Sequence, residues 1–431
     1  MAYWDQAKEC MSRDEISQLQ LERLQATLNR VFKNVSHYRK LFKERDFIPY
    51  DLTSLDQLKD LPFTTRSDLY KNYPYGMFAV PLREVVRLHA PSLSLGKPVV
   101  MGFTDKDLKN WAELMARNLF AVGVTQDDVV QVSLNFGLMT GPFGVQLGAE
   151  RIGASVVPMS VGKMAAQVSI MRDFRTTVLV STATFALNLI RTMMEMRVDP
   201  NSLALKYGIF GAEPWLESTR KELEERLPIV HALDTYGITE LYAPGVAWEC
   251  PYKNGLHISE DHFIAEIIDP DTLAVLPENE IGELVITTIT KEAFPLIRFR
   301  TGDLTSITKT PCSCGRTHAR IKRINKRCDH MIVMRGTSFS PDQIGAVLEN
   351  AAGTKLNFQL VVEMKGDRDY LTVYVEISPL VFSDKMREMR SFVDLMHKEV
   401  SEYLGWEVPV VLTDAGSFDP LETVLDKRRF T

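Results

Sequence analysis

The chain has 431 residues, of which 45% are hydrophobic and 25% are charged, a composition typical of a globular protein with a sizeable core. This length favours one large domain accompanied by a smaller one. The formal net charge of −6 comes without a long cluster of Lys and Arg, so the sequence argues against nucleic acid as a partner.

Compartment and redox state follow from the apolar runs and the cysteines. Residues 1–30 are studded with charge, and the apolar runs fall far short of the ~20 residues that span a bilayer. We therefore expect no membrane association and a cytoplasmic protein. Five cysteines in a chain of this length do not make a disulfide scaffold, so clustered cysteines are interpreted as metal ligands or nucleophiles.

The first sixty residues predict helices, because apolar side chains recur at helical spacing between Leu19 and Val31. From about residue 85 strands and helices alternate. The expected strands are 129–133, 154–158 and 177–181, and the expected helices are 143–153 and 164–173. Such alternation predicts an α/β fold in which a mostly parallel sheet is covered by helices on both faces.

Beyond Glu240 the sequence becomes rich in strands, which are expected at 262–268, 282–287 and 304–307. A boundary is expected near Arg327. It divides a large N-terminal domain, residues 1–326, from a small α+β domain, residues 327–431. In the small domain we expect strands at 331–334, 357–364, 370–377 and 407–412, and helices from 341 and over 383–403.

Four side chains have the spacing and chemistry of a metal site. Cys250 and His257 lie seven positions apart, and Cys312 and Cys314 lie two positions apart in a turn that includes a glycine. Three thiolates and an imidazole suit tetrahedral zinc, and a set of four protein ligands indicates a structural ion. His318 is the reserve ligand. The alternative is that these four residues are unrelated buried or polar positions.

Several short motifs occur in a fixed order along the chain. They are 10–13 (CMSR), 61–66 (LPFTTR) with 68–69 (DL), 211–214 (GAEP), 236–240 (YGITE) and 312–318 (CSCGRTH). Through these motifs the chain resembles the phenylacetate-CoA ligase family of the adenylate-forming superfamily, nearly from end to end. The resemblance implies the adenylate-forming fold, with a β-rich part in the large domain and a small mobile C-terminal domain that rotates beside Asp329.

The resemblance also implies a nucleotide site. The Thr239 hydroxyl would lie near the α-phosphate, Glu240 at the magnesium, Asp303 at the ribose hydroxyls, and Arg327 near ribose and phosphate. The adenine and acyl pocket would be lined by Gly211, Ala212, Glu213, Pro214, Tyr236 and Gly237. Residues 91–98 align with the family's phosphate loop, where Gly96 and Lys97 match; they form either a weakened phosphate loop or a surface turn.

Other positions depart from the family pattern. Leu93 replaces a loop glycine and Leu95 a threonine, which removes backbone freedom and a phosphate donor. Pro420 stands where relatives carry the adenylating lysine, with Lys427 the first candidate to replace that lysine if the protein is active. Gln146 lies in an altered acyl pocket.

These departures favour a non-adenylating descendant as the main interpretation, with weak or lost use of ATP, AMP and magnesium. It would act on a CoA or carrier-protein thioester, by acyl transfer or as an accessory protein in polyketide-type biosynthesis. Coenzyme A or phosphopantetheine, a biosynthetic partner protein and a homodimer are the corresponding expectations. The alternative is an active aryl-CoA ligase that converts carboxylate, ATP and CoA into acyl-CoA, AMP and pyrophosphate.

Overall fold

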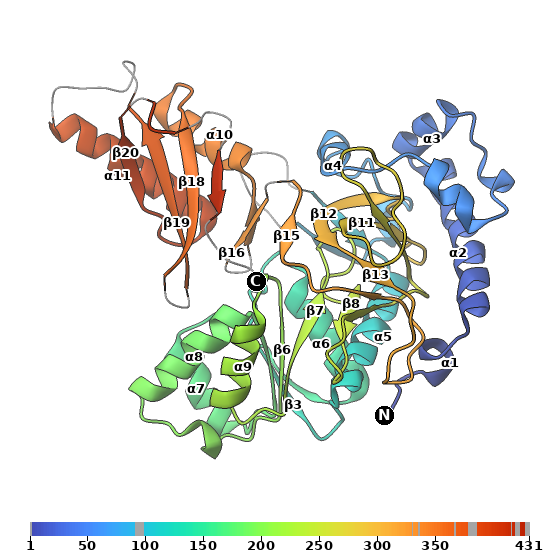
Figure 1. The fold of residues 1–431 in the computed structure, drawn as a ribbon, viewed down its shortest axis with the longest axis horizontal. Coiled ribbons are helices and arrows are strands. Elements are labelled where there is room, and N and C mark those ends of the chain that lie inside the picture. The colour runs from blue at the N-terminus through green and yellow to red at the C-terminus, as the bar shows by residue number, and fades with distance from the viewer. Residues whose placement is uncertain are drawn as a thin grey trace. The chain divides into compact units, whose positions relative to one another are not determined.

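The computed structural model describes residues 2–90, 99–329, 331–334, 337–365, 368–377, 386–414, 416–418 and 423–426. These residues form two compact units, one ending at Cys328 and one running from Asp329 towards the C-terminus (Figure 1). The expected positions 91–98, which include Gly96 and Lys97, lie outside the described residues, as do Pro420 and Lys427.

A nine-stranded sheet is the backbone of the first unit, in the order β13-β14-β9-β8-β7-β6-β5-β3-β4. Neighbouring strands from β4 to β7 are parallel, and the pairs from β7 to β13 are antiparallel. The strands are β3 Val129–Val132, β4 Ser155–Val157, β5 Val178–Ser181, β6 Tyr207–Gly211, β7 His231–Tyr236, β8 Ala247–Glu249, β9 Leu256–Ile258, β13 Ile307–Thr308 and β14 Arg320–Ile321.

Helices cover both faces of the parallel strands, because alternate residues along a strand point to opposite faces. On β5, Val178 and Val180 belong to the large core that includes α5 and α6, whereas Leu179 belongs to a second core with α7, α8 and α9. The helices of this unit are α1 Gln6–Glu9, α2 Arg13–Asn34, α3 Ser36–Lys43, α4 Arg66–Lys71, α5 Asp105–Val122, α6 Gly141–Ile152, α7 Met164–Asp173, α8 Ala183–Glu195 and α9 Glu217–Arg226.

The local sequence sets both ends of helix α5. Helix α5 begins after Thr104, whose hydroxyl accepts from the Asp107 amide while the Asp107 carboxylate accepts from the Thr104 amide. It ends at Gly123, which adopts the left-handed conformation that terminates many helices.

A separate antiparallel sheet, β10-β11-β12-β15, completes the first unit together with the β1-β2 pair. The bounds are β1 Arg87–His89, β2 Met101–Phe103, β10 Phe263–Ile268, β11 Gly282–Thr288, β12 Phe299–Thr305 and β15 Lys326–Arg327. The expected strand at 304–307 is wrong in its limits, because β12 begins at Phe299 and the chain leaves that sheet at Ser306 to form β13 in the larger one.

The second unit is a small α+β body with its own core. Its described residues form a four-stranded sheet in the order β20-β19-β18-β21, a β16-β17 hairpin and two helices. The elements are β16 Ile332–Met334, β17 Thr337–Phe339, α10 Pro341–Ala352, β18 Phe358–Lys365, β19 Arg368–Glu376, α11 Met386–Leu404, β20 Val410–Thr413 and β21 Val424–Asp426.

The predicted fold class is confirmed: an α/β unit with a β-rich part, accompanied by a small α+β unit. The expectation of a mostly parallel sheet holds only from β4 to β7, because the pairs from β7 to β13 are antiparallel and the nine-stranded sheet is therefore mixed. None of the helices in the described residues is long and apolar enough to cross a membrane.

Candidate functional site

Two of the sequence motifs follow neighbouring parallel strands. Strand β6 ends at Gly211 and β7 at Tyr236, and Gly211 pairs directly with Thr235 in the parallel register. The residues after them, 212–214 and 237–240, therefore emerge at the same carboxyl edge of the sheet. That edge is where open α/β sheets bind ligands.

Close backbone packing explains both glycines at this edge. A Cβ on Gly211 would lie 2.4 Å from the carbonyl oxygen of Thr235, and one on Gly237 would lie 2.4 Å from that of Tyr242. Neither position can accept a larger residue without displacing backbone. Ala212 has φ of 64°, a left-handed conformation that turns the chain sharply as it leaves β6.

Tyr236, Asp303 and Arg327 form one cluster, in which Asp303 is buried and the other two side chains are half-buried. The Tyr236 hydroxyl donates to Asp303 Oδ2 over 2.6 Å, and Arg327 is paired with Asp303 Oδ1. Strands β12 and β15 place Asp303 directly opposite Arg327. Burial, reinforced by the charge of Asp303, holds the pKa of Tyr236 well above its ordinary value of 10.0, so the phenol stays a neutral donor.

Glu240 is held beside this cluster by Arg66. Arg66 Nε lies 3.1 Å from Glu240 Oε1, and both side chains are largely shielded from solvent. Arg66 also donates to the carbonyl oxygen of Thr301 over 2.9 Å, and Arg327 donates to the same oxygen over 2.7 Å. The Thr301 carbonyl thus joins the Glu240 pair to the Asp303 cluster.

The sequence missed the part that Arg66 plays. Arg66 belongs to the motif at 61–66, but no role was assigned to it, and only the structure shows its contact with Glu240. Among the other expected positions, Glu213 accepts a hydrogen bond from the Thr184 amide, and Pro214 and Thr239 are half-buried. Gln146 donates to Glu150 one turn further along α6.

The four predicted metal ligands come together. Their ligand atoms all lie within 4.8 Å of one another, and all four residues are buried. Cys250 Sγ lies 3.8 Å from Cys312 Sγ, and His257 Nε2 lies 3.5 Å from Cys314 Sγ. Cys250 directly follows β8, and His257 lies within β9.

Thiol chemistry in this cluster suits a soft metal ion. A hydrogen bond from Cys250 lowers the pKa of Cys314 to about 2, and the same interaction raises the pKa of Cys250. Burial lowers the pKa of His257, but hydrogen bonds to Cys312 and Cys314 outweigh it and raise that pKa overall. The donor set of three sulfurs and one imidazole nitrogen fits tetrahedral zinc.

His318, the reserve ligand, is not part of the cluster. Its Nδ1 faces the Ile258 carbonyl and its Nε2 faces the Lys8 carbonyl, each at 2.9 Å. The N-terminal segment covers the cysteine turn from this side. Tyr3 donates to the Cys314 carbonyl, and buried Glu9 pairs with buried Arg316 at 2.6 Å.

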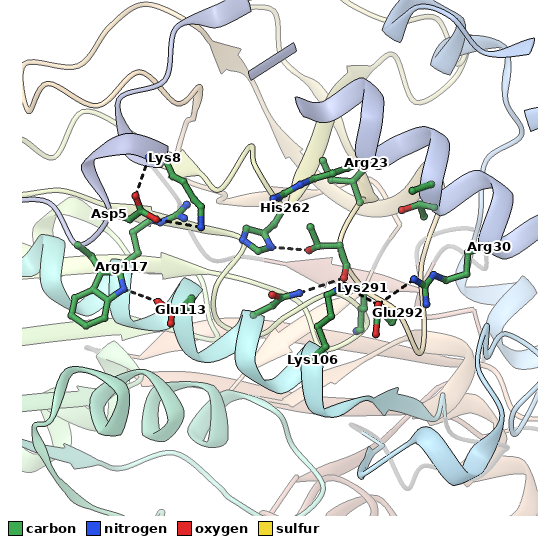
Figure 2. Close-up of a pocket in the computed structure, with 16 residues that line it drawn as sticks. Asp5, Lys8, Arg23, Arg30, Lys106, Glu113, Arg117, His262, Lys291 and Glu292 are labelled. Atoms are coloured by element: carbon green, nitrogen blue, oxygen red, sulfur yellow. Dashed lines mark hydrogen bonds and ion pairs between the residues drawn. The ribbon is translucent and has the colours of Figure 1, made fainter. Parts of the chain in front are cut away.

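A cavity of about 280 Å³ lies between α1, α2, α5 and residues 289–292 (Figure 2). Basic side chains such as Arg23 and Arg117 dominate its walls, and Glu292 pairs with Arg30 and Lys106 at its rim. Its lining comes from parts of the chain other than the motifs at 211–214 and 236–240. Lys291 joins the two regions, since it lines the cavity and donates to the carbonyl of Glu240.

The arrangement of motifs at one sheet edge, with a second α+β unit, defines the class of adenylate-forming enzymes. Residues 106–290 match the AMP-binding enzyme family, and residues 336–428 match the AMP-binding enzyme C-terminal domain. Over 425 residues the chain is 41% identical to a phenylacetate-coenzyme A ligase of Pseudomonas putida, covering 97% of this chain and 96% of the relative. A protein of the same name from Escherichia coli is 39% identical over 95% of this chain and 93% of its own length.

The chain therefore belongs to the phenylacetate-coenzyme A ligase family. Among solved structures, a 2-hydroxyisobutyryl-CoA ligase in complex with 2-HIB-AMP and CoA matches with a TM-score of 0.92 at 26% identity. That match covers 99% of this chain and 93% of the other. The amide bond synthetase McbA of Marinactinospora thermotolerans, at 14% identity and a TM-score of 0.56, shares the fold.

These relatives correct the main interpretation of the sequence. The expectation of a non-adenylating protein that works on a ready-made thioester is wrong, because the relatives support the alternative, an active aryl-CoA ligase. The error came from weighing a few short departures, at Leu93, Leu95 and Pro420, above a likeness that extends along the whole chain.

Proposed function

We propose that this protein is an ATP-dependent aryl-CoA ligase, with phenylacetate or a close aryl carboxylate as substrate. One observation carries the proposal: the Thr301 carbonyl accepts from both Arg66 and Arg327 and so joins the Glu240 and Asp303 carboxylates in one site. Two carboxylates held by arginines at a sheet edge are suited to binding a magnesium nucleotide. The names of the relatives support the choice of acid and thiol.

In the first proposed step, a carboxylate oxygen attacks the α-phosphorus of ATP. A new O–P bond forms, the bond to the β-phosphate oxygen breaks, and pyrophosphate leaves with the electron pair. Asp303, which is paired with Arg327, accepts from the ribose hydroxyls, while Thr239 donates to the α-phosphate. Glu240 would hold a magnesium ion through a carboxylate oxygen, the ligand type that this ion prefers, and the ion would neutralise phosphate charge.

In the second proposed step, the CoA thiol attacks the acyl carbon of the adenylate. A C–S bond forms, the C–O bond to AMP breaks, and the thiol proton is released. We propose that domain 327–431 rotates near Asp329 between the steps. The separate compact unit from Asp329 and the family match at 336–428 support this division. A biosynthetic partner protein, a homodimer and a cytoplasmic location stay predictions from the sequence.

Zinc at Cys250, His257, Cys312 and Cys314 is proposed as a structural ion. The closed set of four protein ligands leaves no position for substrate, so the ion would fix the turn at 312–315 against β8 and β9.

The proposed function is tested by exchange of labelled pyrophosphate into ATP in the presence of phenylacetate and magnesium. We expect pyrophosphate exchange that depends on the acid. The substitution Glu240→Gln should lower the exchange rate by about 10²–10³, the usual effect of losing one electrostatic group in an active site. Exchange that does not depend on any aryl acid in a panel would contradict the proposal.

A further inference from the structure

Lys291 is a fully buried lysine that the motifs did not single out. Its side chain is 1% exposed in the interior of the first unit. The ammonium nitrogen donates to two consecutive backbone carbonyls, that of Leu241 over 2.6 Å and that of Glu240 over 3.2 Å. These carbonyls belong to the loop that follows β7 and carries Glu240 itself.

The segment that carries Lys291 is anchored to the start of α5. The Asp107 carboxylate accepts from the Glu292 amide at 2.7 Å and from the Ala293 amide at 3.0 Å. The same carboxylate caps the first turn of α5 through Thr104. Lys291 therefore projects from a backbone that is anchored immediately after it.

Aromatic rings enclose the amine. Its nitrogen lies 4.5 Å from the ring centroid of Phe103, 4.9 Å from that of Tyr242 and 5.5 Å from that of Phe294. Burial in this box lowers the pKa of Lys291 to about 7, against the attraction of Asp107 and Glu240. A buried amine of this kind opposes folding, and an apolar side chain of similar length would pack in its place.

Glu240 is thus held at two points from two directions. Arg66 pairs with its carboxylate, and Lys291 fixes the carbonyls of Glu240 and Leu241. Both protonation states of an amine have at least two N–H groups, so both can make the two bonds.

We propose that Lys291 is a positioning residue for adenylation. By holding the carbonyls of the 240–241 loop, it fixes the direction in which Glu240 presents its carboxylate to the magnesium nucleotide. The inference rests on the proposed function of Glu240. It concerns the first half-reaction only, because the CoA thiol attacks after pyrophosphate and its metal have left.

The decisive variant is Lys291→Met, which keeps most of the length and the apolar volume but removes the amine and both of its hydrogen bonds. Lys106→Met is the matched control, since Lys106 is an exposed lysine that pairs with the neighbouring Glu292. For Lys291→Met we expect pyrophosphate exchange to fall about 100-fold, the scale of a misplaced catalytic group. The half-saturating magnesium concentration should rise, while thioester formation from supplied phenylacetyl adenylate and CoA stays within about twofold. Lys106→Met should match the wild type in pyrophosphate exchange, in the half-saturating magnesium concentration and in thioester formation.

A second readout does not depend on activity. Hydrogen exchange of the peptide spanning 238–245 should quicken in Lys291→Met and stay unchanged in Lys106→Met, while the midpoint of thermal unfolding is kept or raised. The inference is overturned if Lys291→Met changes neither the hydrogen exchange of the 238–245 peptide nor the rate of pyrophosphate exchange. It is also overturned if the rates of both half-reactions fall together with the unfolding midpoint. If the wild type shows no acid-dependent pyrophosphate exchange, the proposed function is contradicted instead. Faster hydrogen exchange of the 238–245 peptide in Lys291→Met would then still support the role of Lys291 in holding the 240–241 loop.

Discussion

Asp303→Asn removes one negative charge from the Tyr236, Asp303 and Arg327 cluster and changes little else. The amide keeps the shape of the side chain, and its oxygen can still accept from the Tyr236 hydroxyl. The charge-assisted bond from Arg327 is lost, and Arg327 retains only 12% of its side-chain exposure, so water compensates little. Hydrogen bonds to charged groups contribute about 1.5–3 kcal/mol, so we expect a loss of about 2 kcal/mol in unfolding free energy.

The same change should also weaken the use of ATP. If Asp303 accepts from the ribose hydroxyls, a loss of about 1.5–3 kcal/mol corresponds to roughly 10- to 100-fold in kcat/KM for ATP. The KM for the aryl acid should stay within about twofold. Initial rates of pyrophosphate release at varied ATP and at varied acid separate the two effects.

Asp128→Asn is the matched control for Asp303→Asn. Asp128 is also buried and paired, with Lys206 at 3.3 Å, but it precedes β3 and so lies at the opposite edge of the sheet. The Asp128→Asn variant should be less stable than the wild type but keep the same kcat/KM for ATP. The reasoning is refuted if Asp303→Asn lowers stability as the control does and leaves kcat/KM for ATP unchanged.

Cys314→Ser should reduce bound zinc below about half an equivalent and lower the unfolding midpoint. The KM for ATP should not change, because the ion is proposed to be structural. Metal analysis of protein purified without chelator tests this prediction. Burial lowers the pKa of Lys291 to about 7, so the folded protein releases this proton at a lower pH than the unfolded chain does. Wild-type stability should therefore rise relative to Lys291→Met as pH increases from about 7 towards the ordinary lysine value of 10.5, as followed by denaturant unfolding; a constant difference would contradict it. If Lys427 supplies the adenylating cation, Lys427→Ala should lower pyrophosphate exchange by about 10²–10³, and unchanged exchange would exclude that assignment.

The sequence predicted the elements that depend on local pattern. Helix α7 occupies the predicted 164–173, and the buried strand β5 lies within the predicted 177–181, because period and apolar runs are properties of neighbouring residues. The metal cluster was also accessible, since thiol chemistry and spacing single out its members. The limits of β12 were not, because they are set by pairing with β11 and β15 and not by a pattern within the strand itself.

Side-chain contacts across the chain were the part that the sequence could not supply. Arg66 and Glu240 are 174 positions apart, and nothing local to either residue predicts their contact. In the sequence, Lys291 precedes Glu292 and shows no feature that would indicate a buried lysine. Its burial and its bonds to the 240–241 carbonyls depend on how three distant segments pack.

The central claim is that this chain joins an aryl acid to CoA at the expense of ATP. The most direct measurement mixes the purified protein with phenylacetate, ATP, magnesium and CoA and quantifies the thioester by mass spectrometry alongside AMP and pyrophosphate. The account predicts the three products in equal amounts, with no thioester when ATP is omitted. Absence of all three products across a panel of aryl carboxylates, or a thioester formed without ATP, would contradict it.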